Sequence, residues 1–290
     1  MKIISIAFVT LAFLCSCCKT EKSEPVNVAT FNIRLAPNPE FDAWKNRRDA
    51  VCALIKKHGF EIFGTQEGYF YQLEEIVNST GYKFVAHGRE DGKRGGETAA
   101  VFYNPARFEL LDSGAFWFAE TPDKPVLGWD AACKRVCSWG KFRDTKTDKI
   151  FYFFCMHLDH MGKVARAQSA KMLAAKVAEI AKGKPFFCVG DFNATTDQEP
   201  MKIIFSEKIF QDSLAKAAKK QNAESGTFHA YTGQPKVSRI DYILVSDGVD
   251  VSEYSVIKDS CADLGLPPAS DKIPYPSDHF PVKITAEIKK

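Results

Sequence analysis

A short apolar segment that ends in a carboxylate and an amide constrains this chain more than any other feature. Residues 186–189 (FFCV) lie between Pro185 and Gly190, and four apolar residues bounded in this way are typical of a buried strand. Asp191 and Asn193 follow directly. Because side chains two residues apart on a strand point the same way, both can converge just beyond the edge of a sheet. An ordinary strand that ends in an Asx turn shows the same pattern, so the other strand ends must be compared with it.

Length and composition indicate a soluble globular protein. The chain has 290 residues, of which 45% are hydrophobic and 26% charged, and this is enough for a sizeable core. The sequence shows no repeat and no break in composition after residue 25, so we expect one domain over residues 26–290. The net charge of +3 is spread along the chain. A nucleic-acid partner is therefore not favoured, although charge alone does not exclude one. We expect a monomer.

The first 25 residues have the features of a targeting segment. Lys2 precedes a twelve-residue apolar run over 3–14, which is shorter than the roughly 20 residues that span a bilayer but suits a signal peptide. The sequence LCSC at 14–17 resembles a bacterial lipoprotein cleavage box. The resemblance implies a signal peptide over 1–16, an acylated Cys17, and a tether (17–25) that anchors the protein in a membrane outside the cytoplasm. The alternative is an ordinary signal peptide that is cleaved nearby.

The nine cysteines do not indicate a disulfide framework or a zinc site. Cys155 and Cys188 lie within apolar strand patterns and are expected to pack as small hydrophobic side chains. Cys133 and Cys137 form the one close pair that could bridge. The cysteines outside the strand patterns have no histidine at the spacing of a zinc site, so we expect none.

Helices and strands alternate in the first half of the chain, and strands pair as hairpins later. The patterns predict helices over 46–58, 69–78, 163–181 and 199–205. They predict strands over 26–34, 60–66, 82–86, 98–103, 108–112, 135–142, 149–158, 186–189, 240–245, 249–258 and 280–288. The aromatic residues over 116–129 are expected in a long connection. This order favours an α/β four-layer sandwich, in which two mixed β-sheets pack together and helices flank them.

Polar residues recur at the ends of these strands. They are Asn32, Glu67, His157, Asp191, Asn193, Asp241, Asp278 and His279. If these ends meet at one edge of the sheets, several carboxylates share one cleft and repel each other unless a cation or a proton is present. Oxygen ligands in this number suit Mg²⁺, with Mn²⁺ or Ca²⁺ as alternatives. Such an ion beside histidines is typical of phosphoryl chemistry.

Six short motifs, in order, then resemble those of a known superfamily. They are TFNIR (30–34), GTQE (64–67), HLDH (157–160), GDFN (190–193), RIDY (239–242) and SDHFP (277–281). Together they resemble the endonuclease/exonuclease/phosphatase superfamily, which includes deoxyribonuclease I, abasic-site endonucleases, inositol polyphosphate 5-phosphatases and bacterial sphingomyelinases. The resemblance covers about residues 26–288. It implies the deoxyribonuclease I-like sandwich and a metal-dependent phosphoesterase.

The resemblance also implies a metal site and a catalytic carboxylate. Glu67, with Asn32 and Asp278 nearby, corresponds to the metal site. Asp191 corresponds to the residue that orients or deprotonates the attacking water. Asn193 corresponds to the residue that holds this water or a phosphate oxygen.

Two histidines are implied to face the phosphate. His279 would pair with Asp241, which keeps the imidazole charged or determines its tautomer. His157 would be the second histidine, paired with Glu97 as in deoxyribonuclease I. The abasic-site enzymes have tyrosine in place of His157, so this chain departs from them and a DNA-repair function is less favoured.

Each single residue also has a purely structural interpretation. Asn32 could cap a strand turn, Glu67 could lie at a helix N-terminus, and Asp278 could be a turn residue. Asp241 could pair with Arg239 instead of a histidine.

Several neighbouring residues have two interpretations. Asp159 and His160 could line the pocket or lie in a solvated loop. Arg166 could reach a phosphate, although a surface position is favoured. Three tryptophans could wall a substrate cleft or anchor loops on the core: Trp44, Trp117 and Trp129.

The sequence therefore predicts an extracytoplasmic, lipid-anchored, metal-dependent phosphoesterase. Its substrate stays open among nucleic acids, phospholipids, and sugar or inositol phosphates. Residues 116–118 (FWF) are the one candidate for an exposed loop that contacts lipid. The alternative from another class is a non-catalytic binding protein on the same fold, anchored at the cell surface.

Overall fold

A computed structural model describes residues 24–35 and 42–289. The predicted signal peptide, Cys17 and most of the tether lie outside the described residues. The tether's last two residues are held by the domain, because Arg107 donates hydrogen bonds to the carbonyls of Glu24 (2.9 Å) and Pro25 (2.8 Å). No helix among the described residues is long and apolar enough to cross a membrane.

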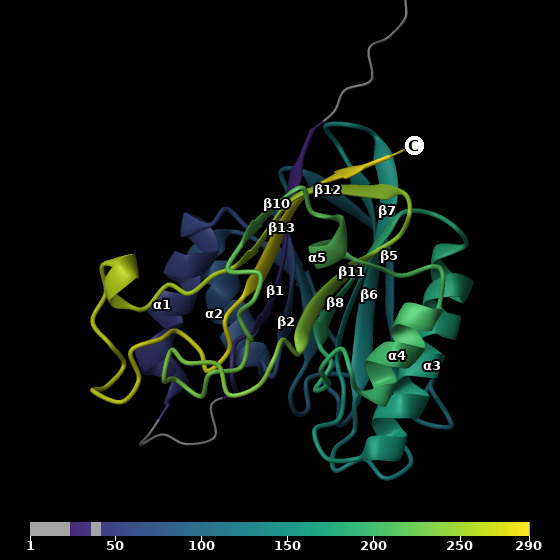
Figure 1. Cartoon of the computed structure of the whole chain (residues 1–290), viewed down its shortest axis with the longest axis horizontal. Helices are drawn as coiled ribbons and strands as arrows, with labels where there is room; N and C mark the ends of the chain where they lie inside the picture. Colours follow the sequence, from purple (N-terminus) through teal and green to yellow (C-terminus); the bar gives the residue numbers. More distant parts are fainter. Residues whose placement is uncertain (1–23, 36–41, 290) are drawn as a thin grey trace, which may run out of the picture.

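Two mixed β-sheets pack face to face at the centre of the molecule (Figure 1). The seven-stranded sheet has the order β10-β12-β13-β1-β2-β4-β3 and the six-stranded sheet the order β5-β6-β7-β8-β11-β9. The first contains β1 (Val26–Asn32), β2 (Ile62–Gln66), β3 (Lys83–Val85), β4 (Ala99–Tyr103), β10 (Lys219–Gln221), β12 (Val249–Val256) and β13 (Val282–Ile288). The second contains β5 (Phe108–Trp117), β6 (Val136–Asp144), β7 (Lys149–His157), β8 (Phe186–Asp191), β9 (Gln211–Asp212) and β11 (Asp241–Val245).

Helices cover the outer faces of both sheets (Figure 1). On one side lie α1 (Trp44–Lys57) and α2 (Phe70–Thr80), and on the other α3 (Lys163–Ala181) and α4 (Glu199–Ser206). The short α5 (Ser213–Lys216) and a 3₁₀ turn, η1 (Ala262–Leu264), lie in the connections. The predicted four-layer sandwich is confirmed.

The apolar core has three parts because the central strands are buried on both faces. On β1, Val28 faces the opposite sheet, whereas Phe31 packs toward α1. The sheets approach closely at Gly64, where a Cβ atom would lie 2.5 Å from Val189 Cγ2. Strands buried on two faces read as continuous apolar runs, and for this reason residues 186–189 could be recognised in the sequence.

The aromatic segment after residue 115 differs from the prediction. β5 continues to Trp117, and Phe116, Trp117 and Phe118 are all buried. The rings of Phe116 and Phe118 pack edge to face, with centroids 5.4 Å apart. The segment therefore belongs to the core and offers no exposed lipid-contacting loop.

Other differences concern helix starts, cysteines and short elements. Trp44 was expected in a loop but begins α1. Cys133 and Cys137, like the other described cysteines, are free. The elements β9, β10 and α5 were not predicted, because segments of two to four residues are too short to show a hydrophobic period.

Strand pairing brings the C-terminal ends of four strands and the start of a fifth to one edge. β1 is parallel to β2, with Asn32 opposite Gln66, and β7 is parallel to β8, with His157 opposite Asp191. β11 is antiparallel to β8 and begins with Asp241 opposite Asp191. The polar residues that follow these strands therefore meet at one end of the sandwich.

Candidate active site

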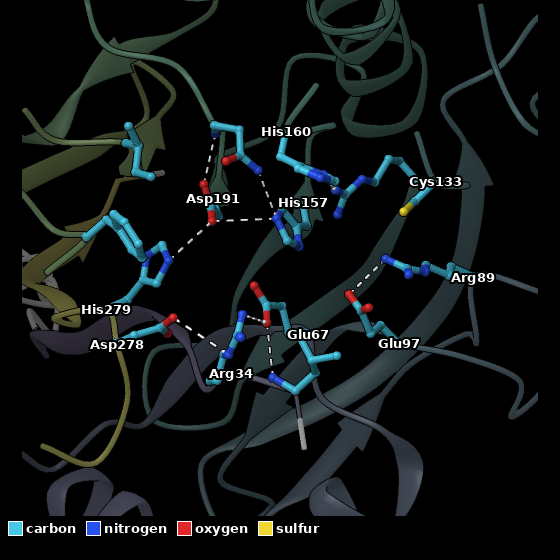
Figure 2. A pocket seen from close by; sticks show the side chains of 15 residues that line it. Arg34, Glu67, Arg89, Glu97, Cys133, His157, His160, Asp191, Asp278 and His279 are labelled. Carbon is cyan, nitrogen blue, oxygen red and sulfur yellow. Dashed lines mark hydrogen bonds and ion pairs between the residues drawn. The ribbon is translucent and has the colours of Figure 1, made fainter. Parts of the chain in front are cut away.

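A pocket of about 370 Å³ opens at this edge (Figure 2). Seven of the predicted site residues line it: Glu67, Glu97, His157, Asp191, Asn193, Asp278 and His279. The other two, Asn32 and Asp241, lie behind the pocket wall and hydrogen-bond to residues that line it. The structure thus brings the predicted residues together, although Glu97 has a different partner from the one predicted.

Asp191 lies at the centre of the site. Its carboxylate accepts hydrogen bonds from Asn32 Nδ2 (3.1 Å, to Oδ2) and from the backbone N–H of Asn193 (2.9 Å, to Oδ1). Burial, together with the nearby charge of Asp241, raises the pKa of Asp191 to about 7. A carboxylate with this pKa is suited to accept a proton near neutral pH.

Two histidines face Asp191 from opposite sides. The Oδ2 atom of Asp191 lies 3.5 Å from His157 Nε2 and 3.8 Å from His279 Nε2. Asn193 Nδ2 lies 3.0 Å from His157 Nε2 and donates to the Leu158 carbonyl at 3.0 Å. Since this amide nitrogen can only donate, His157 Nε2 accepts and the ring is neutral. Burial and the nearby Arg135 hold the pKa of His157 well below its usual value, which agrees with a neutral ring.

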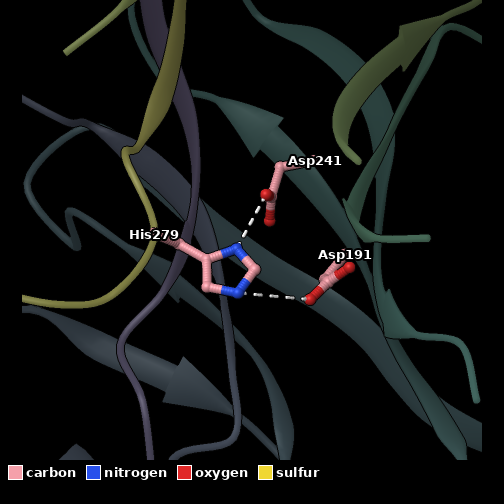
Figure 3. Close-up of side chains that lie close together, drawn as sticks. All are labelled: Asp191, Asp241 and His279. Carbon is pink, nitrogen blue, oxygen red and sulfur yellow. Dashed lines mark hydrogen bonds and ion pairs between the residues drawn. The ribbon is translucent and has the colours of Figure 1, made fainter. Parts of the chain in front are cut away.

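His279, in contrast to His157, is protonated and carries a positive charge. Its Nδ1 atom lies 2.9 Å from Asp241 Oδ2 (Figure 3). Burial lowers the pKa of His279, but the charge and hydrogen bond of Asp241 outweigh this effect and raise it to about 10. Asp241 does not pair with Arg239, which instead forms an ion pair with Asp212. The site therefore contains one neutral and one cationic histidine.

Glu67 and Asp278 form an acidic pair beside this centre. Glu67 has a left-handed backbone (φ 68°), and strain of this kind is concentrated at functional sites. Its carboxylate accepts hydrogen bonds from Asn32 Nδ2 (2.9 Å) and the Leu35 N–H (3.0 Å). The Arg34 guanidinium lies 3.7 Å from both Glu67 and Asp278.

A buried arginine from α1 positions the loops that carry these residues. Arg47 is fully buried, and its Nη1 atom donates to the carbonyls of Ile33 (2.9 Å) and Pro276 (2.8 Å). The Ser277 hydroxyl donates to the Asn32 carbonyl at 2.6 Å. These bonds join the loop after β1 to the loop before β13. Arg47 was not recognisable in the sequence as a positioning residue, because a helical arginine usually lies at the surface.

The residues present fit a divalent cation. Glu67 and Asp278 supply buried carboxylate oxygens, and Arg34 stays at 3.7 Å from both rather than at direct hydrogen-bonding distance. Ligand atoms of Asp191, Asp241 and His279 also lie within 4.8 Å of one another. In that second cluster the cationic imidazole already offsets one of the two carboxylate charges. The Glu67–Asp278 pair offers carboxylate oxygens without an imidazole, and hard cations prefer oxygen ligands.

The predicted pairing of Glu97 with His157 is wrong. Glu97 Oε2 accepts a hydrogen bond from Arg89 Nη1 at 2.8 Å. Burial raises the pKa of Glu97 to about 7, although the charge of Arg89 opposes this shift. Arg89 comes from the loop before β4, and the competing salt bridge could not be recognised from sequence order.

Asp159 organises the loop after β7. It is buried, and its carboxylate accepts hydrogen bonds from the backbone N–H groups of Ala132, Cys133, Met161 and Gly162 and from Arg135 Nε. Burial would raise its pKa, but the Gly162 and Met161 N–H groups dominate and lower it to about 2. Asp159 thus neither lines the pocket nor lies in solvent.

Other residues near this loop also differ from expectation. His160 lines the pocket, as one interpretation allowed. Arg166 is buried and donates to the Asp159 carbonyl at 2.9 Å, so it is neither a surface residue nor a phosphate ligand. The three tryptophans pack on the core rather than against the pocket. Pocket residues missed in the sequence include Arg34, Arg89, Cys133 and Arg135, and only Arg34 lay within a motif.

Known proteins share this sequence pattern and fold. Residues 29–279 match the sequence profile of the Endonuclease/Exonuclease/phosphatase family. The chain belongs to the endonuclease/exonuclease/phosphatase family. A family member from Bacteroides thetaiotaomicron is 35% identical, with a TM-score of 0.86 and coverage of 93% of this chain and 97% of that chain. Membership in this family supports phosphoester hydrolysis as the chemistry of the site.

Two further structures and one sequence are also similar. A mannosyl-6-phosphatase from Bacteroides thetaiotaomicron is 36% identical, with a TM-score of 0.84 and coverage of 90% of this chain and 99% of that chain. The catalytic domain of human Nocturnin is 20% identical, with a TM-score of 0.67 and coverage of 91% and 95%, and shares the fold. An uncharacterized protein of Acanthamoeba polyphaga mimivirus is 28% identical in an alignment of 127 residues that covers 40% of this chain and 46% of that protein.

Proposed function

We propose that the protein is a divalent-metal-dependent phosphomonoesterase that acts on phosphorylated sugars. The observation that carries the proposal is the position of Asp191, whose Oδ2 atom lies within 3.8 Å of both a neutral and a cationic histidine. A proton acceptor beside a cationic hydrogen-bond donor and a neutral imidazole is the equipment that hydrolysis of a phosphoester by water requires.

The side chains have separate roles in this reaction. Asp191 accepts a proton from the attacking water as the new bond to phosphorus forms. The bond to the leaving oxygen breaks, and this oxygen takes up a proton from solvent to become a hydroxyl group. The cationic His279, held by Asp241, donates a hydrogen bond to a phosphate oxygen and offsets its charge. Asn193 Nδ2, which lies 3.0 Å from His157 Nε2, holds the His157 ring in place.

Glu67 and Asp278, with Asn32 beside them, are the proposed ligands of the cation. The cation would offset the negative charge that accumulates on the phosphoryl group. Mg²⁺ is the proposed ion because carboxylate oxygens suit it, and Mn²⁺ and Ca²⁺ are the alternatives to test. Arg34, which lines the same wall, is placed to contact the phosphate.

Sugar phosphates are proposed as substrates for two reasons. A relative with 36% identity over 90% of this chain is a mannosyl-6-phosphatase. The pocket also has several hydrogen-bonding side chains beyond the catalytic residues, among them Arg89, Arg135 and His160. We further propose that the enzyme acts outside the cytoplasm, anchored through a lipid on Cys17, because residues 1–25 have the pattern of a lipoprotein signal.

A substrate panel tests the proposal. Hexose 6-phosphates, phenyl phosphate, bis-p-nitrophenyl phosphate, sphingomyelin and single-stranded DNA are incubated with the protein, with Mg²⁺ or with excess chelator. We expect turnover of the monoesters that depends on the divalent ion. Turnover of the diesters alone would reject a monoesterase, and no turnover of any substrate would favour the non-catalytic binding protein.

A further inference from the structure

An arginine–glutamate pair lines the side of the pocket away from the cationic histidine. In Figure 2, Arg89 and Glu97 lie beyond His157, whereas His279 and Asp278 lie on its other side. Arg89 Nη1 donates to Glu97 Oε2 at 2.8 Å, and both side chains are largely buried. The proposed hydrolysis does not use this pair.

The backbone holds the pair in place. The Arg89 N–H donates to the Glu97 carbonyl at 2.9 Å, and the Arg89 carbonyl accepts from Trp117 Nε1 at 2.9 Å. Within the same loop, the Asp91 carboxylate accepts from the N–H groups of Lys93 (2.7 Å) and Gly95 (2.8 Å). The loop is therefore preorganised rather than dependent on a ligand for its shape.

A second guanidinium on this side is also already paired. Arg135 Nε lies 3.3 Å from Asp159 Oδ2, and its Nη2 lies 3.0 Å from His160 Nδ1. Arg135 and His160 both line the pocket. This side of the pocket thus offers hydrogen-bond donors and one carboxylate acceptor, with each guanidinium charge balanced by an acid.

This balance selects against a second anionic group. A second phosphate here would face the Glu97 carboxylate and would find no unpaired guanidinium. A neutral hydroxyl group, in contrast, can donate to Glu97 and accept from Arg89 at the same time. A rigid array of paired donors and acceptors is suited to neighbouring hydroxyl groups.

We propose that the Arg89–Glu97 pair, together with Arg135 and His160, binds the hydroxyl groups of the neutral sugar that leaves during hydrolysis. This sugar subsite, as we name these four residues, rests on the proposed phosphomonoesterase function and specifies its substrate class. The subsite accounts for selection of a sugar monophosphate over a sugar bisphosphate or a nucleic-acid strand.

Changing the charge of the pair tests the subsite. Glu97→Gln removes the carboxylate that lines the subsite and leaves Arg89 with only the half-exposed Glu90 as an ion-pair partner, 3.4 Å from its Nε atom, so the subsite becomes more cationic. We expect the ratio of kcat/KM for mannose 6-phosphate to that for mannose 1,6-bisphosphate to fall by about 10-fold or more. A merely structural role would lower both values together and leave the ratio unchanged.

A matched control comes from another arginine–glutamate pair. Arg143 and Glu109 form an exposed ion pair on β6 and β5 that does not line the pocket. Glu109→Gln removes the same charge in the same kind of pair, and we expect it to leave the ratio unaltered. An unchanged ratio in Glu97→Gln, or an equal change in both variants, would overturn the proposal.

Labelling of Cys133 tests the subsite without catalysis and in the unmodified chain. Cys133 lines the pocket and is half-buried, whereas the other described cysteines are buried. Iodoacetamide labelling of the peptide that contains Cys133 is followed by mass spectrometry, with mannose, glycerol or inorganic phosphate present. We expect mannose to slow labelling several-fold and glycerol to have little effect.

The two experiments separate the sugar subsite from the proposed function. Protection of Cys133 by mannose in a protein without turnover would support the subsite and reject the phosphomonoesterase. Turnover of phenyl phosphate with no protection by mannose, or with equal protection by phosphate alone, would reject the subsite and leave the phosphomonoesterase standing.

Discussion

Asp241 Oδ2 lies 2.9 Å from His279 Nδ1, and this contact determines the charge of the histidine that faces Asp191. Both side chains are buried, so a neutral imidazole would otherwise be favoured there. The two residues come from different sheets, since Asp241 begins β11 and His279 precedes β13. The positive charge on His279 therefore depends on the packing of the two sheets against each other.

Asp241→Asn is expected to lower kcat by about 10- to 100-fold, because the imidazole loses the charge that keeps it protonated and the partner that orients it. Steady-state kinetics with a hexose 6-phosphate measure the effect. Asp212→Asn, which removes the partner of Arg239 outside the pocket, serves as the control. Equal kcat in Asp241→Asn and in the unmodified protein would contradict the role of the pair.

Asp191→Asn is expected to reduce turnover by about 10²- to 10⁴-fold, the range for loss of a general base. The fold should persist, because an amide can keep the hydrogen bond from the Asn193 N–H. Turnover and thermal unfolding are measured on the same sample. If activity survives in a folded variant, Asp191 is not the proton acceptor.

Mg²⁺ is expected to stabilise the protein, and Glu67→Gln to remove the stabilisation. An ion that binds the folded state at 100 times its Kd adds about 2.7 kcal/mol to the free energy of unfolding. Urea unfolding with and without Mg²⁺ measures this gain independently of activity. Asp271→Asn, which changes an exposed acid, is the control and should keep the gain. A gain that survives in Glu67→Gln places the cation elsewhere.

Asp159→Ala is expected to lower the free energy of unfolding by about 2–4 kcal/mol, because several buried donors lose their acceptor. The pKa of about 2 lies below the ordinary value of about 3.9, so the Asp159 carboxylate stabilises the fold above pH 4. This contribution, roughly 2.5 kcal/mol, is lost as the pH falls toward 2. Urea unfolding is measured between pH 6 and pH 2 for the unmodified protein and for Asp159→Ala. The difference between their free energies of unfolding should shrink as the pH falls. If the difference in free energy of unfolding stays constant over this pH range, the ionised Asp159 carboxylate does not stabilise the fold.

Arg47→Lys is expected to destabilise the protein by about 3 kcal/mol, since one ammonium cannot replace a guanidinium that bonds several carbonyls. Arg48→Lys, at a partly exposed position on the same helix, should change stability by less than about 0.5 kcal/mol. Thermal and urea unfolding of both variants provide the comparison. Similar losses in the two variants would show that the loops are held by other contacts.

The sequence by itself determined most of the elements and the composition of the site. The helix over 163–181 was predicted with the observed bounds, and the strand over 186–189 was recognisable because a strand buried on both faces reads as an apolar run. The polar residues at strand ends were also visible, because chain order and parallel pairing place such ends at one edge.

Only the tertiary structure decided which charges meet. Glu97 pairs with Arg89 rather than His157, and Arg47 turns inward to join two loops. The pairing of Asp241 with His279, in contrast, was already implied by the family resemblance and is confirmed. Ion pairs and hydrogen bonds depend on distances of a few ångströms between residues far apart in the chain. A hydrophobic period carries no information about such distances, because it reports which face of an element is buried and not what lies opposite that face.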